Sequence, residues 1–394
     1  MEGFKLKILF ISENYYPKLS GVPVVVQYLA ERLNEKGHDV AVLTKKIEGC
    51  SDFEIFNGIK IIRFDIYMNK LKMYKGKINE FIEYIKQYNA DVYIFEGATV
   101  VTTDVVLPYL KDINGIKILH SHGFSRLLLK PFQKMSTFKN TIGNTYNYIR
   151  WKGFFKSLLP KYINDFNIVF CLSEVDSSYK YLNQIFNGKV NVIGNAADDI
   201  FFEKSKRTIE KYTTIKGKGY LLSVANYDAI KNQIGILQQY YKSQSKDYDL
   251  VFIGREKNYY YEALIDENKK LSKQYGEKNV HILTDIKRED IPGIYEYAFL
   301  YLVGSVAEGY SISIIESMSK GVPFISTDVG NARLLPGGIV IKNINQLCTT
   351  IDKIINSTKL YKKMSVNGKQ YAFENCRIES ATSMLLKLIY ESEN

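Results

Sequence analysis

The chain has few of the features that mark several common classes of protein. Its 394 residues include only four cysteines, which are too few for a disulfide framework and too scattered for a zinc site. No uninterrupted apolar run approaches the ~18 residues of a membrane-spanning helix, and the N-terminus shows no apolar stretch of a secretion signal. We therefore expect a cytoplasmic protein that does not span a membrane.

Acidic residues are missing from one long stretch. Residues 113–164 contain no Asp or Glu but carry nine Lys and Arg, whereas the net charge of the whole chain is +11. Such a density of positive charge suits an anionic membrane surface or a nucleic acid. Because no nucleic-acid-binding motif accompanies the charge, we expect no nucleic-acid partner.

The length and the hydrophobic pattern predict two α/β domains. The chain is longer than the size at which a single core usually stops growing. Short β-branched runs alternate with helix-like segments, which is typical of doubly wound, Rossmann-like parallel sheets. We place the domains at 1–205 and 206–375, with a linker in the charged stretch 203–219 and a C-terminal helix, 376–394, that crosses back to the first domain.

Thirteen short runs are predicted strands. They cover residues 7–12, 39–43, 59–64, 91–95, 117–120, 168–172, 190–193, 220–224, 250–253, 280–283, 299–303, 322–326 and 338–341. Ligands bind beyond the carboxyl ends of parallel strands, and two facing sheets place those ends across a common cleft. Site residues are therefore expected directly after strands.

Two glutamates eight residues apart follow the strand 299–303. On one helix, Glu308 and Glu316 would lie about 12 Å apart, whereas the carboxylates of a glycosidase are ~5 to 10 Å apart. Two separated carboxylates suit one long ligand, such as a sugar nucleotide, with helix N-terminal amides between them for a diphosphate. The alternative is that Glu308 stabilises the helix dipole and Glu316 faces solvent.

The run Glu308-Gly-Tyr-Ser-Ile-Ser-Ile-Ile-Glu316, followed by Gly321-Val-Pro323, resembles the Glu-x7-Glu signature of retaining glycosyltransferase family 4. The resemblance extends along most of the chain. It implies the GT-B fold, an acceptor-side N-terminal domain, a nucleotide-sugar-binding C-terminal domain and a reaction without a metal cofactor. It also implies that Glu308 contacts the donor sugar and Glu316 the ribose. Backbone amides would meet the sugar and phosphates at Gly309, Tyr310, Ser311, Ile312 and Ser313.

A second part of the family pattern is present only in part. After the strand 220–224, the family has a loop whose arginine and lysine hold the diphosphate. Lys231 matches the lysine and would stabilise the departing diphosphate, but Asn226 stands where arginine is usual. Arg255, which follows Gly254, is a candidate for the missing positive charge. Lys231 as an ordinary surface lysine is the alternative.

Two further residues follow strands of the first domain. Gly21 resembles the family's phosphate-facing loop, although a single glycine replaces the common pair. His120 ends the strand 117–120, where the family places a histidine near the donor sugar, and His122 is the second choice. Either histidine could instead cap the strand or fill a hydrogen-bonded pocket.

The acid-free stretch carries apolar residues at helical spacing with lysines beside them. This pattern is typical of a helix that lies on an anionic membrane surface. A helix that packs in the core with its lysines in solvent would show the same pattern. Because family members that build cell-surface polysaccharide often use lipid-linked acceptors, we expect a glycan or lipid-linked acceptor and a peripheral position on the cytoplasmic face of the membrane. The residues assigned to this side are Lys130, Arg150, Trp151, Lys152, Phe155 and Lys156.

Two other functions fit the same pattern. One is a nucleotide-sugar epimerase of the same fold, and the other is a non-catalytic glycosyltransferase-like binding subunit, which the exchange at Asn226 motivates. The run Asp247-Tyr-Asp249 matches a metal-binding Asp-x-Asp pattern but precedes its strand. We interpret it as a turn and expect no metal site.

Overall fold

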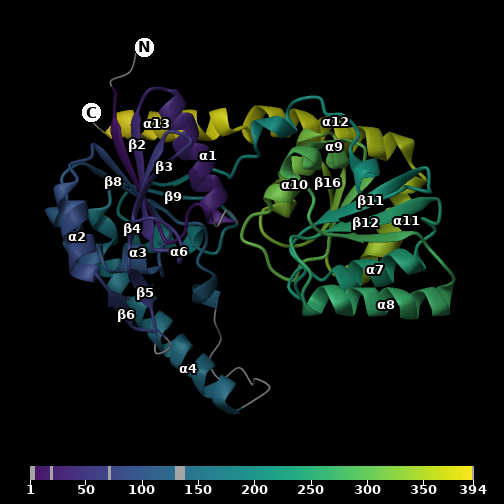
Figure 1. The fold of residues 1–394 in the computed structure, drawn as a ribbon, viewed down its shortest axis with the longest axis horizontal. Helices are drawn as coiled ribbons and strands as arrows, with labels where there is room; N and C mark the ends of the chain where they lie inside the picture. The colour runs from purple at the N-terminus through teal and green to yellow at the C-terminus, as the bar shows by residue number, and fades with distance from the viewer. Residues whose placement is uncertain (1–4, 18–20, 70–71, 129–137, 393–394) are drawn as a thin grey trace. The chain divides into compact units, whose positions relative to one another are not determined.

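The computed structural model describes residues 5–17, 21–69, 72–128 and 138–392, and the chain divides into two compact units (Figure 1). Unit 1 comprises Met1–Gly194 and Ala381–Asn394, and unit 2 comprises Asn195–Ser380. No helix within the described ranges is long and apolar enough to cross a membrane.

Unit 1 is built on a sheet in which eight strands of the described residues pair in the order β10-β9-β8-β7-β1-β2-β4-β3. All neighbours are parallel except β3, which runs antiparallel to β4. The strands are β1 Lys7–Ser12, β2 Asp39–Lys45, β3 Phe53–Phe56, β4 Ile59–Phe64, β7 Val92–Glu96, β8 Ile116–His120, β9 Ile168–Cys171 and β10 Val190–Val192; a separate antiparallel pair is β5 Ile66–Met68 and β6 Tyr74–Gly76.

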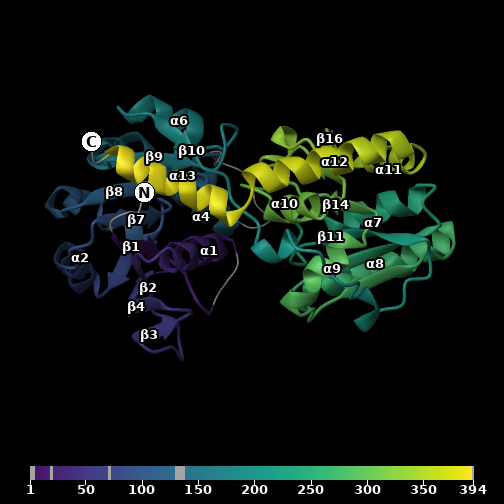
Figure 2. The ribbon, with the colours of Figure 1, turned by 90° about the horizontal axis from the view of Figure 1, so that it is seen from above.

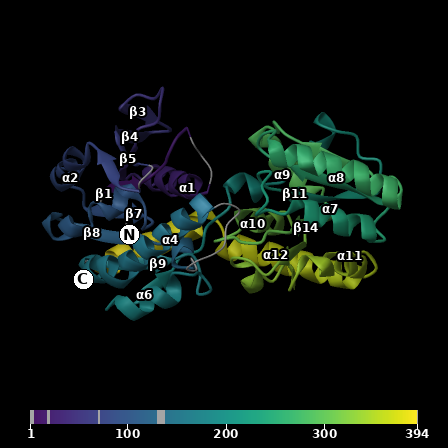
Figure 3. The same cartoon turned by 90° about the horizontal axis from the view of Figure 1, so that it is seen from below.

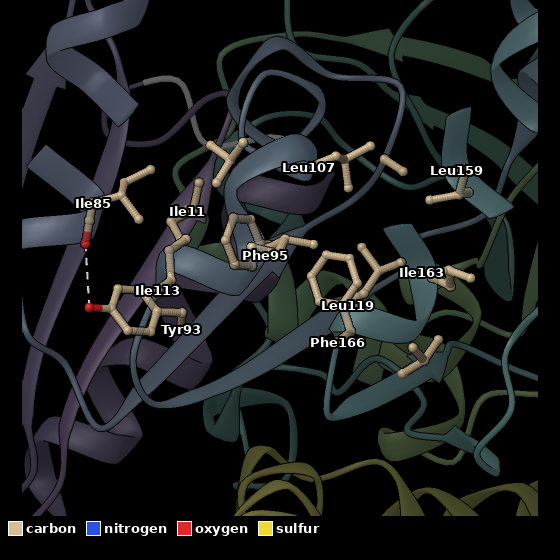
Figure 4. Close-up of a cluster of buried hydrophobic side chains, with 14 of the residues drawn as sticks. Ile11, Ile85, Tyr93, Phe95, Leu107, Ile113, Leu119, Leu159, Ile163 and Phe166 are labelled. Carbon is tan, nitrogen blue, oxygen red and sulfur yellow. Dashed lines mark hydrogen bonds between the residues drawn. The ribbon is translucent and has the colours of Figure 1, made fainter. Parts of the chain in front are cut away.

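The helices of unit 1 are α1 Val22–Glu35, α2 Ile78–Gln87, α3 Val101–Asp104, α4 Phe138–Gly153, α5 Leu159–Tyr162, α6 Tyr179–Ile185 and, from residue 381 on, α13 Ile378–Ser392. Figure 1 shows that α4 extends away from the sheet. Because side chains alternate along a strand, Leu9 and Ile11 join the core shown in Figure 4, together with residues of α2, α3 and α5. Figure 2 shows α13 running across unit 1 near α1, and its Leu385 and Ile389 are buried.

Unit 2 is a parallel sheet of the order β13-β12-β11-β14-β15-β16 within the described residues. Tyr220 and Leu222 face a core with α9, α10 and α12, whereas Leu221 faces a second core with α7, α8 and α11. Figure 3 labels these helices along the ribbon. The strands are β11 Gly219–Val224, β12 Tyr248–Ile253, β13 Val280–Leu283, β14 Leu300–Val303, β15 Phe324–Thr327 and β16 Gly338–Ile341; the helices are α7 Gln233–Lys242, α8 Tyr259–Tyr275, α9 Ile291–Glu296, α10 Ile312–Ser319, α11 Leu347–Ile355 and α12 Thr358–Asn375.

The predicted α/β class with two doubly wound sheets is confirmed, and each of the thirteen predicted strands is present. The short pair β5 and β6 was not predicted, and neither was the strand β3. It lies at the edge of the sheet, and its Phe53 and Ile55 are 56% and 64% exposed. An edge strand with exposed apolar residues lacks the buried run that marked the central strands.

The charged stretch 203–219 is not a linker, so that prediction is wrong. Its Ile209 is fully buried in the core of unit 2. Asp290 holds the same stretch through Lys211 Nζ at 2.5 Å and the hydroxyl of Tyr212 at 2.6 Å. The charged residues hid this packing because a single buried isoleucine gives no periodic signal. The division between the units falls instead after Gly194.

Candidate functional site

In unit 2, the order of the strands reverses at β11, which lies between β12 and β14. The loops that follow β11 and β14 therefore lie next to each other at the carboxyl edge of the sheet, where doubly wound folds bind ligands. Lys231 belongs to the first loop and Glu308 to the second. Lys231 Nζ lies 2.7 Å from Glu308 Oε1, so the fold brings together two residues that the sequence assigned to the donor.

Both members of this pair are partly shielded from solvent. The side chain of Glu308 is 13% exposed and that of Lys231 is 30% exposed. The hydroxyl of Ser305 donates a second hydrogen bond to Glu308 Oε1, at 2.7 Å. Glu308 is thus held in one position by two donors before any ligand arrives.

Asn232 ties the two loops to each other. It adopts a left-handed conformation at the N-cap of α7, where its Oδ1 accepts a hydrogen bond from the amide of Gly235. Its Nδ2 donates to the carbonyl oxygen of Gly304 at 3.1 Å, and the amide of Val306 donates to the carbonyl of Ile230 at 2.8 Å. These bonds fix the distance between Lys231 and Glu308.

The helix α10 begins just beyond Glu308. Its N-cap residue, Ser311, makes no side-chain capping bond, and the Ser311 amide donates to Asn331 Oδ1 at 3.0 Å. The amide of Ser313 therefore lacks the usual serine cap, and the amide of Ile312, the first residue of the helix, has no partner within the helix. A helix N-terminus in this state is an anion-binding group, as the resemblance implies for a diphosphate.

Glu316 lies on α10, whereas Glu308 lies in the loop that precedes it. The separation expected for two carboxylates on a shared helix therefore does not apply to this pair. Burial raises the pKa of Glu316 to about 7, although Arg288 and the hydroxyl of Tyr295 oppose the rise. Glu316 consequently titrates near neutral pH in the free protein.

The other predicted donor residues of unit 2 make no hydrogen bond or ion pair with Lys231 or Glu308 among the described residues. The side chain of Asn226 is exposed. A Cβ on Gly254 would lie 2.3 Å from the ring of Tyr227, whose hydroxyl donates to the carbonyl of Leu283 at 2.8 Å. Gly254 thus makes room for a tyrosine that supports the loop. Arg255 is exposed, and no ion pair is seen for it within the described residues.

Gly21 is the N-cap residue of α1, with φ of 67°, a conformation that favours glycine. It is exposed, and an added Cβ would meet no atom within 4 Å. The open space around Gly21 leaves the start of α1 accessible.

In unit 1, the carboxyl edge of the sheet presents a carboxylate between two imidazoles. Glu96 ends β7 and His120 ends β8, and the two are partners in the register of these parallel strands. His120 Nδ1 lies 2.9 Å from Glu96 Oε2, and His122 Nε2 contacts the same oxygen. Glu96 was not among the predicted site residues, although a glutamate at the end of the buried run of β7 was a usable signal.

The charges in this cluster are strongly coupled. Burial disfavours ionisation of Glu96, but the two histidines outweigh it and lower its pKa to about 2. Burial, with the neighbouring His122, lowers the pKa of His120 to about 4. At neutral pH, Glu96 is therefore ionised and His120 is neutral.

His120 is poorly placed for contact with a sugar. Its side chain is 2% exposed, and its ring stacks on Phe170 at 4.2 Å and lies 3.7 Å from the ring of His122. The side chain of His122 is more exposed, at 7%. Of the two histidines, His122 is therefore the one nearer to solvent.

The same three residues could hold a metal ion in principle. Glu96, His120 and His122 each offer one ligand atom, and these atoms lie within 4.8 Å of one another. Two imidazoles and a carboxylate suit a divalent transition metal. However, the carboxylate oxygen contacts both rings directly, so interactions within the cluster already account for the arrangement.

The acid-free stretch does not present the apolar face that its spacing predicted. Trp151, Phe155 and Leu159 are 4%, 5% and 0% exposed, and all three belong to the core of unit 1. A π-helical turn, Phe154–Leu158, links α4 to α5 and shifts the register, so that both Phe154 and Phe155 pack inward. Trp151, Phe155 and Leu159 therefore stabilise the fold, whereas Leu158, the fourth apolar residue of the predicted face, is 37% exposed.

Two of the predicted lysines of this stretch are exposed, unlike the aromatic residues beside them. Lys152 and Lys156 are exposed, as expected for solvated or membrane-facing lysines. Arg150 is half-buried and packs on Trp151. Lys130 lies outside the described residues.

Comparisons with known proteins agree with this architecture. Residues 204–371 match the family model of glycosyl transferases group 1, and residues 7–150 match that of the starch synthase catalytic domain. Sucrose-phosphate synthase from Thermosynechococcus elongatus superposes with a TM-score of 0.74 at 15% identity, covering 98% of this chain and 99% of that chain. HepE from Anabaena, in complex with UDP and glucose, superposes with a TM-score of 0.68 at 14% identity, covering 98% and 100% of the two chains.

One subunit of the human phosphatidylinositol N-acetylglucosaminyltransferase is 24% identical over 367 residues, which are 89% of this chain and 69% of that protein. Trehalose synthases from Thermococcus litoralis and Pyrococcus furiosus align over 47% of their own length. The fold is that of a GT-B glycosyltransferase. The matches to both units place the chain in the glycosyltransferase superfamily that has this fold.

Proposed function

We propose that the chain is a retaining glycosyltransferase of family 4 that transfers a sugar from a nucleotide diphosphate to an acceptor hydroxyl. The observation that carries the proposal is the 2.7 Å contact between Lys231 and Glu308 at the strand-order reversal of unit 2, beside the uncapped start of α10. A cation, free amides and a fixed carboxylate are the groups that a sugar diphosphate requires.

Each group has one role in the proposed reaction. Lys231 and the amides of Ile312 and Ser313 bind the diphosphate and stabilise the charge that develops on it. Glu308 accepts hydrogen bonds from the donor sugar, and Glu316 accepts them from the ribose hydroxyls. The backbone of Gly309, Tyr310 and Ser311 follows the sugar and phosphates, as the resemblance to family 4 implies.

The bond changes in this reaction balance without a protein nucleophile. The acceptor oxygen attacks the anomeric carbon from the face that the diphosphate leaves, so the configuration is retained. The bond between the anomeric carbon and the phosphate oxygen breaks as the new glycosidic bond forms. The departing phosphate oxygen takes the proton of the acceptor hydroxyl, and no metal ion takes part.

The first donor to test is a UDP-sugar. HepE, which shares the fold, was solved with UDP-glucose. For the acceptor, we propose a glycan or a lipid-linked molecule used in cell-surface glycan assembly, with the enzyme peripheral on the cytoplasmic face of the membrane. The human relative is named for transfer to phosphatidylinositol, which is itself a lipid, and the exposed Lys152 and Lys156 offer charge to an anionic surface.

A panel of UDP-, GDP- and ADP-sugars tests this proposal. Each donor is incubated with the protein, with and without a glycan or lipid acceptor mixture. Release of the nucleotide diphosphate and a product heavier by one sugar, with the donor's anomeric configuration by NMR, are expected. An inverted product would refute retention.

The same panel separates the two other functions. An epimerase would convert the donor alone into its epimer without net transfer. A non-catalytic subunit would bind a nucleotide but release no diphosphate from any donor, as the exposed Asn226 in place of arginine would suggest.

A further inference from the structure

Two guanidinium groups converge on one ring in unit 1. The carbons Cζ of Arg126 and Arg150 lie 4.1 Å and 4.4 Å from the ring centroid of Trp151, the single tryptophan of the chain. The two carbons are therefore at most about 8.5 Å apart, the sum of those distances. Trp151 is 4% exposed, whereas both arginines are half-buried and reach solvent.

These two arginines lack the partners that most other arginines have. Five others pair with carboxylates: Arg32, Arg63, Arg207, Arg288 and Arg333. In the described part of the chain, neither Arg126 nor Arg150 lies within ion-pair distance of a carboxylate.

Among the residues that the structure describes, few acceptors lie within reach of their donors. Arg126 donates to the carbonyl of Thr99, and Arg150 Nη1 lies 3.2 Å from Met68 Sδ, a weak acceptor. Because each guanidinium has five N–H donors, the pair retains most of its hydrogen-bonding capacity.

Asp104 and Glu13 are the acidic groups that act on Arg126, and both have other partners. Asp104 is 5% exposed, and its two oxygens already accept hydrogen bonds from the Thr99 amide and the Tyr74 hydroxyl. Burial raises the pKa of Asp104 to about 7, which weakens it as a counter-charge. Glu13 is engaged with Lys45 at 3.6 Å. Two like charges at this separation repel each other.

The position of the pair matches a ligand site of the fold. Thr99 follows β7 and Arg126 follows β8, at the carboxyl edge where Glu96 and His122 also lie. The cation–π contacts with the Trp151 ring hold both guanidinium groups in place. A phosphate oxygen accepts from a guanidinium at about 2.8 Å, so one phosphate can bridge two guanidinium groups that reach different oxygens of it.

We propose that Arg126 and Arg150 bind a phosphate group that the acceptor carries. Only the assignment of this phosphate to the acceptor rests on the proposed function, because the anion site itself follows from the contacts in unit 1. The phosphate belongs either to a water-soluble phosphorylated acceptor or to the headgroup of a lipid.

Trp151 makes the site measurable without any enzymatic assay. As the single tryptophan of the chain, in contact with both arginines, it reports an anion there through its fluorescence. Titration of the full-length protein with inorganic pyrophosphate is expected to give a saturable change. Arg126→Gln and Arg150→Gln should each raise the half-saturating concentration at least about tenfold.

Three variants make the result specific. Arg126→Lys and Arg150→Lys keep the charge but lose the fork, so they should weaken binding less than the Gln variants, and they replace any Gln variant that fails to fold. Lys161→Gln removes an exposed charge of the same stretch and should leave the titration unchanged. A response absent in the wild type, or equal in wild type and Gln variants, would overturn the proposal.

A separate variant tests whether the fluorescence response comes from pyrophosphate bound at the donor site. Lys231→Ala should lose nucleotide affinity while it keeps the Trp151 response to pyrophosphate, so the two sites fail independently. Loss of the response in Lys231→Ala alone would overturn the proposal.

Vesicles separate the two sources of phosphate. A response to phosphatidylglycerol vesicles that needs both arginines, and not to phosphatidylcholine, supports a lipid headgroup. A response to pyrophosphate without one to vesicles supports a soluble acceptor.

Discussion

The ion pair between Lys231 and Glu308 predicts opposite effects of its two members on nucleotide binding. In the free protein, Glu308 holds Lys231 at 2.7 Å, and a diphosphate must compete for the same ammonium group. Lys231→Met removes a charge-assisted hydrogen bond to the diphosphate, which is worth about 1.5–3 kcal/mol. The dissociation constant of the nucleotide diphosphate should therefore rise roughly 10- to 150-fold.

Glu308→Gln should have the reverse effect on the same ligand. It removes the competitor at a partly shielded pair, whose coupling is about 1 kcal/mol or less. The nucleotide diphosphate, which has no sugar for Glu308 to contact, should bind equally well or up to about fivefold more tightly. Because Lys231 is the target of both effects, the double variant should bind like Lys231→Met alone.

Isothermal titration calorimetry with UDP, and then with GDP and ADP, measures these constants. Lys246→Met is the matched control, because Lys246 is an exposed lysine of unit 2 away from both loops. The competition between Glu308 and the diphosphate is refuted if Lys231→Met binds the nucleotide as the wild type does. It is equally refuted by a Glu308→Gln variant that loses as much affinity as Lys231→Met.

Three further predictions concern single side chains. The pKa of Glu316 near 7 means that nucleotide affinity should rise between about pH 6 and 8 as its carboxylate forms, and Glu316→Gln should abolish this rise in calorimetry. The pKa of Asp104 is about 7 in the folded protein and 3.8 ordinarily, so the folded state binds more protons than the unfolded state between these pH values. The free energy of unfolding, measured by chemical denaturation, should therefore fall with rising pH across this window, by up to about 4 kcal/mol. Asp104→Asn should remove this part of the pH dependence. Gly254→Ala would place a methyl group 2.3 Å from the buried ring of Tyr227 and should cost about 1–3 kcal/mol in the urea-unfolding free energy, whereas an unchanged midpoint would show that the ring moves aside freely.

The strands and the donor loops were predictable from the sequence because both have local signals. A buried parallel strand is a continuous apolar run, and the loop after it holds the polar residues, as for Lys231 after β11 and Glu308 after β14. The pairing between these two residues was not predictable, because it depends on the order of strands in the sheet and on the bonds that Asn232 makes.

Unit 1 shows what local pattern could not supply. Spacing placed Trp151 and Phe155 on a membrane-facing stripe, but a π-helical turn changes the register and the core takes both rings. No sequence motif includes Arg126. The sequence could not predict that Arg126 and Arg150 contact the same ring, because this depends on how α4 packs against the loop after β8. Glu96 could have been found, because it ends a strand in the same way as His120.

Sugar transfer by the wild type and by Glu308→Gln, with the donor and acceptor that the panel identifies, is the decisive test of the proposed function. Glu277→Gln is the control, because Glu277 is an exposed glutamate of unit 2. We expect the wild type and Glu277→Gln to release nucleotide diphosphate and form a product heavier by one sugar, while Glu308→Gln binds the nucleotide but forms at most about one hundredth as much product. Equal transfer by Glu308→Gln and the wild type would contradict the role of Glu308 in holding the donor sugar.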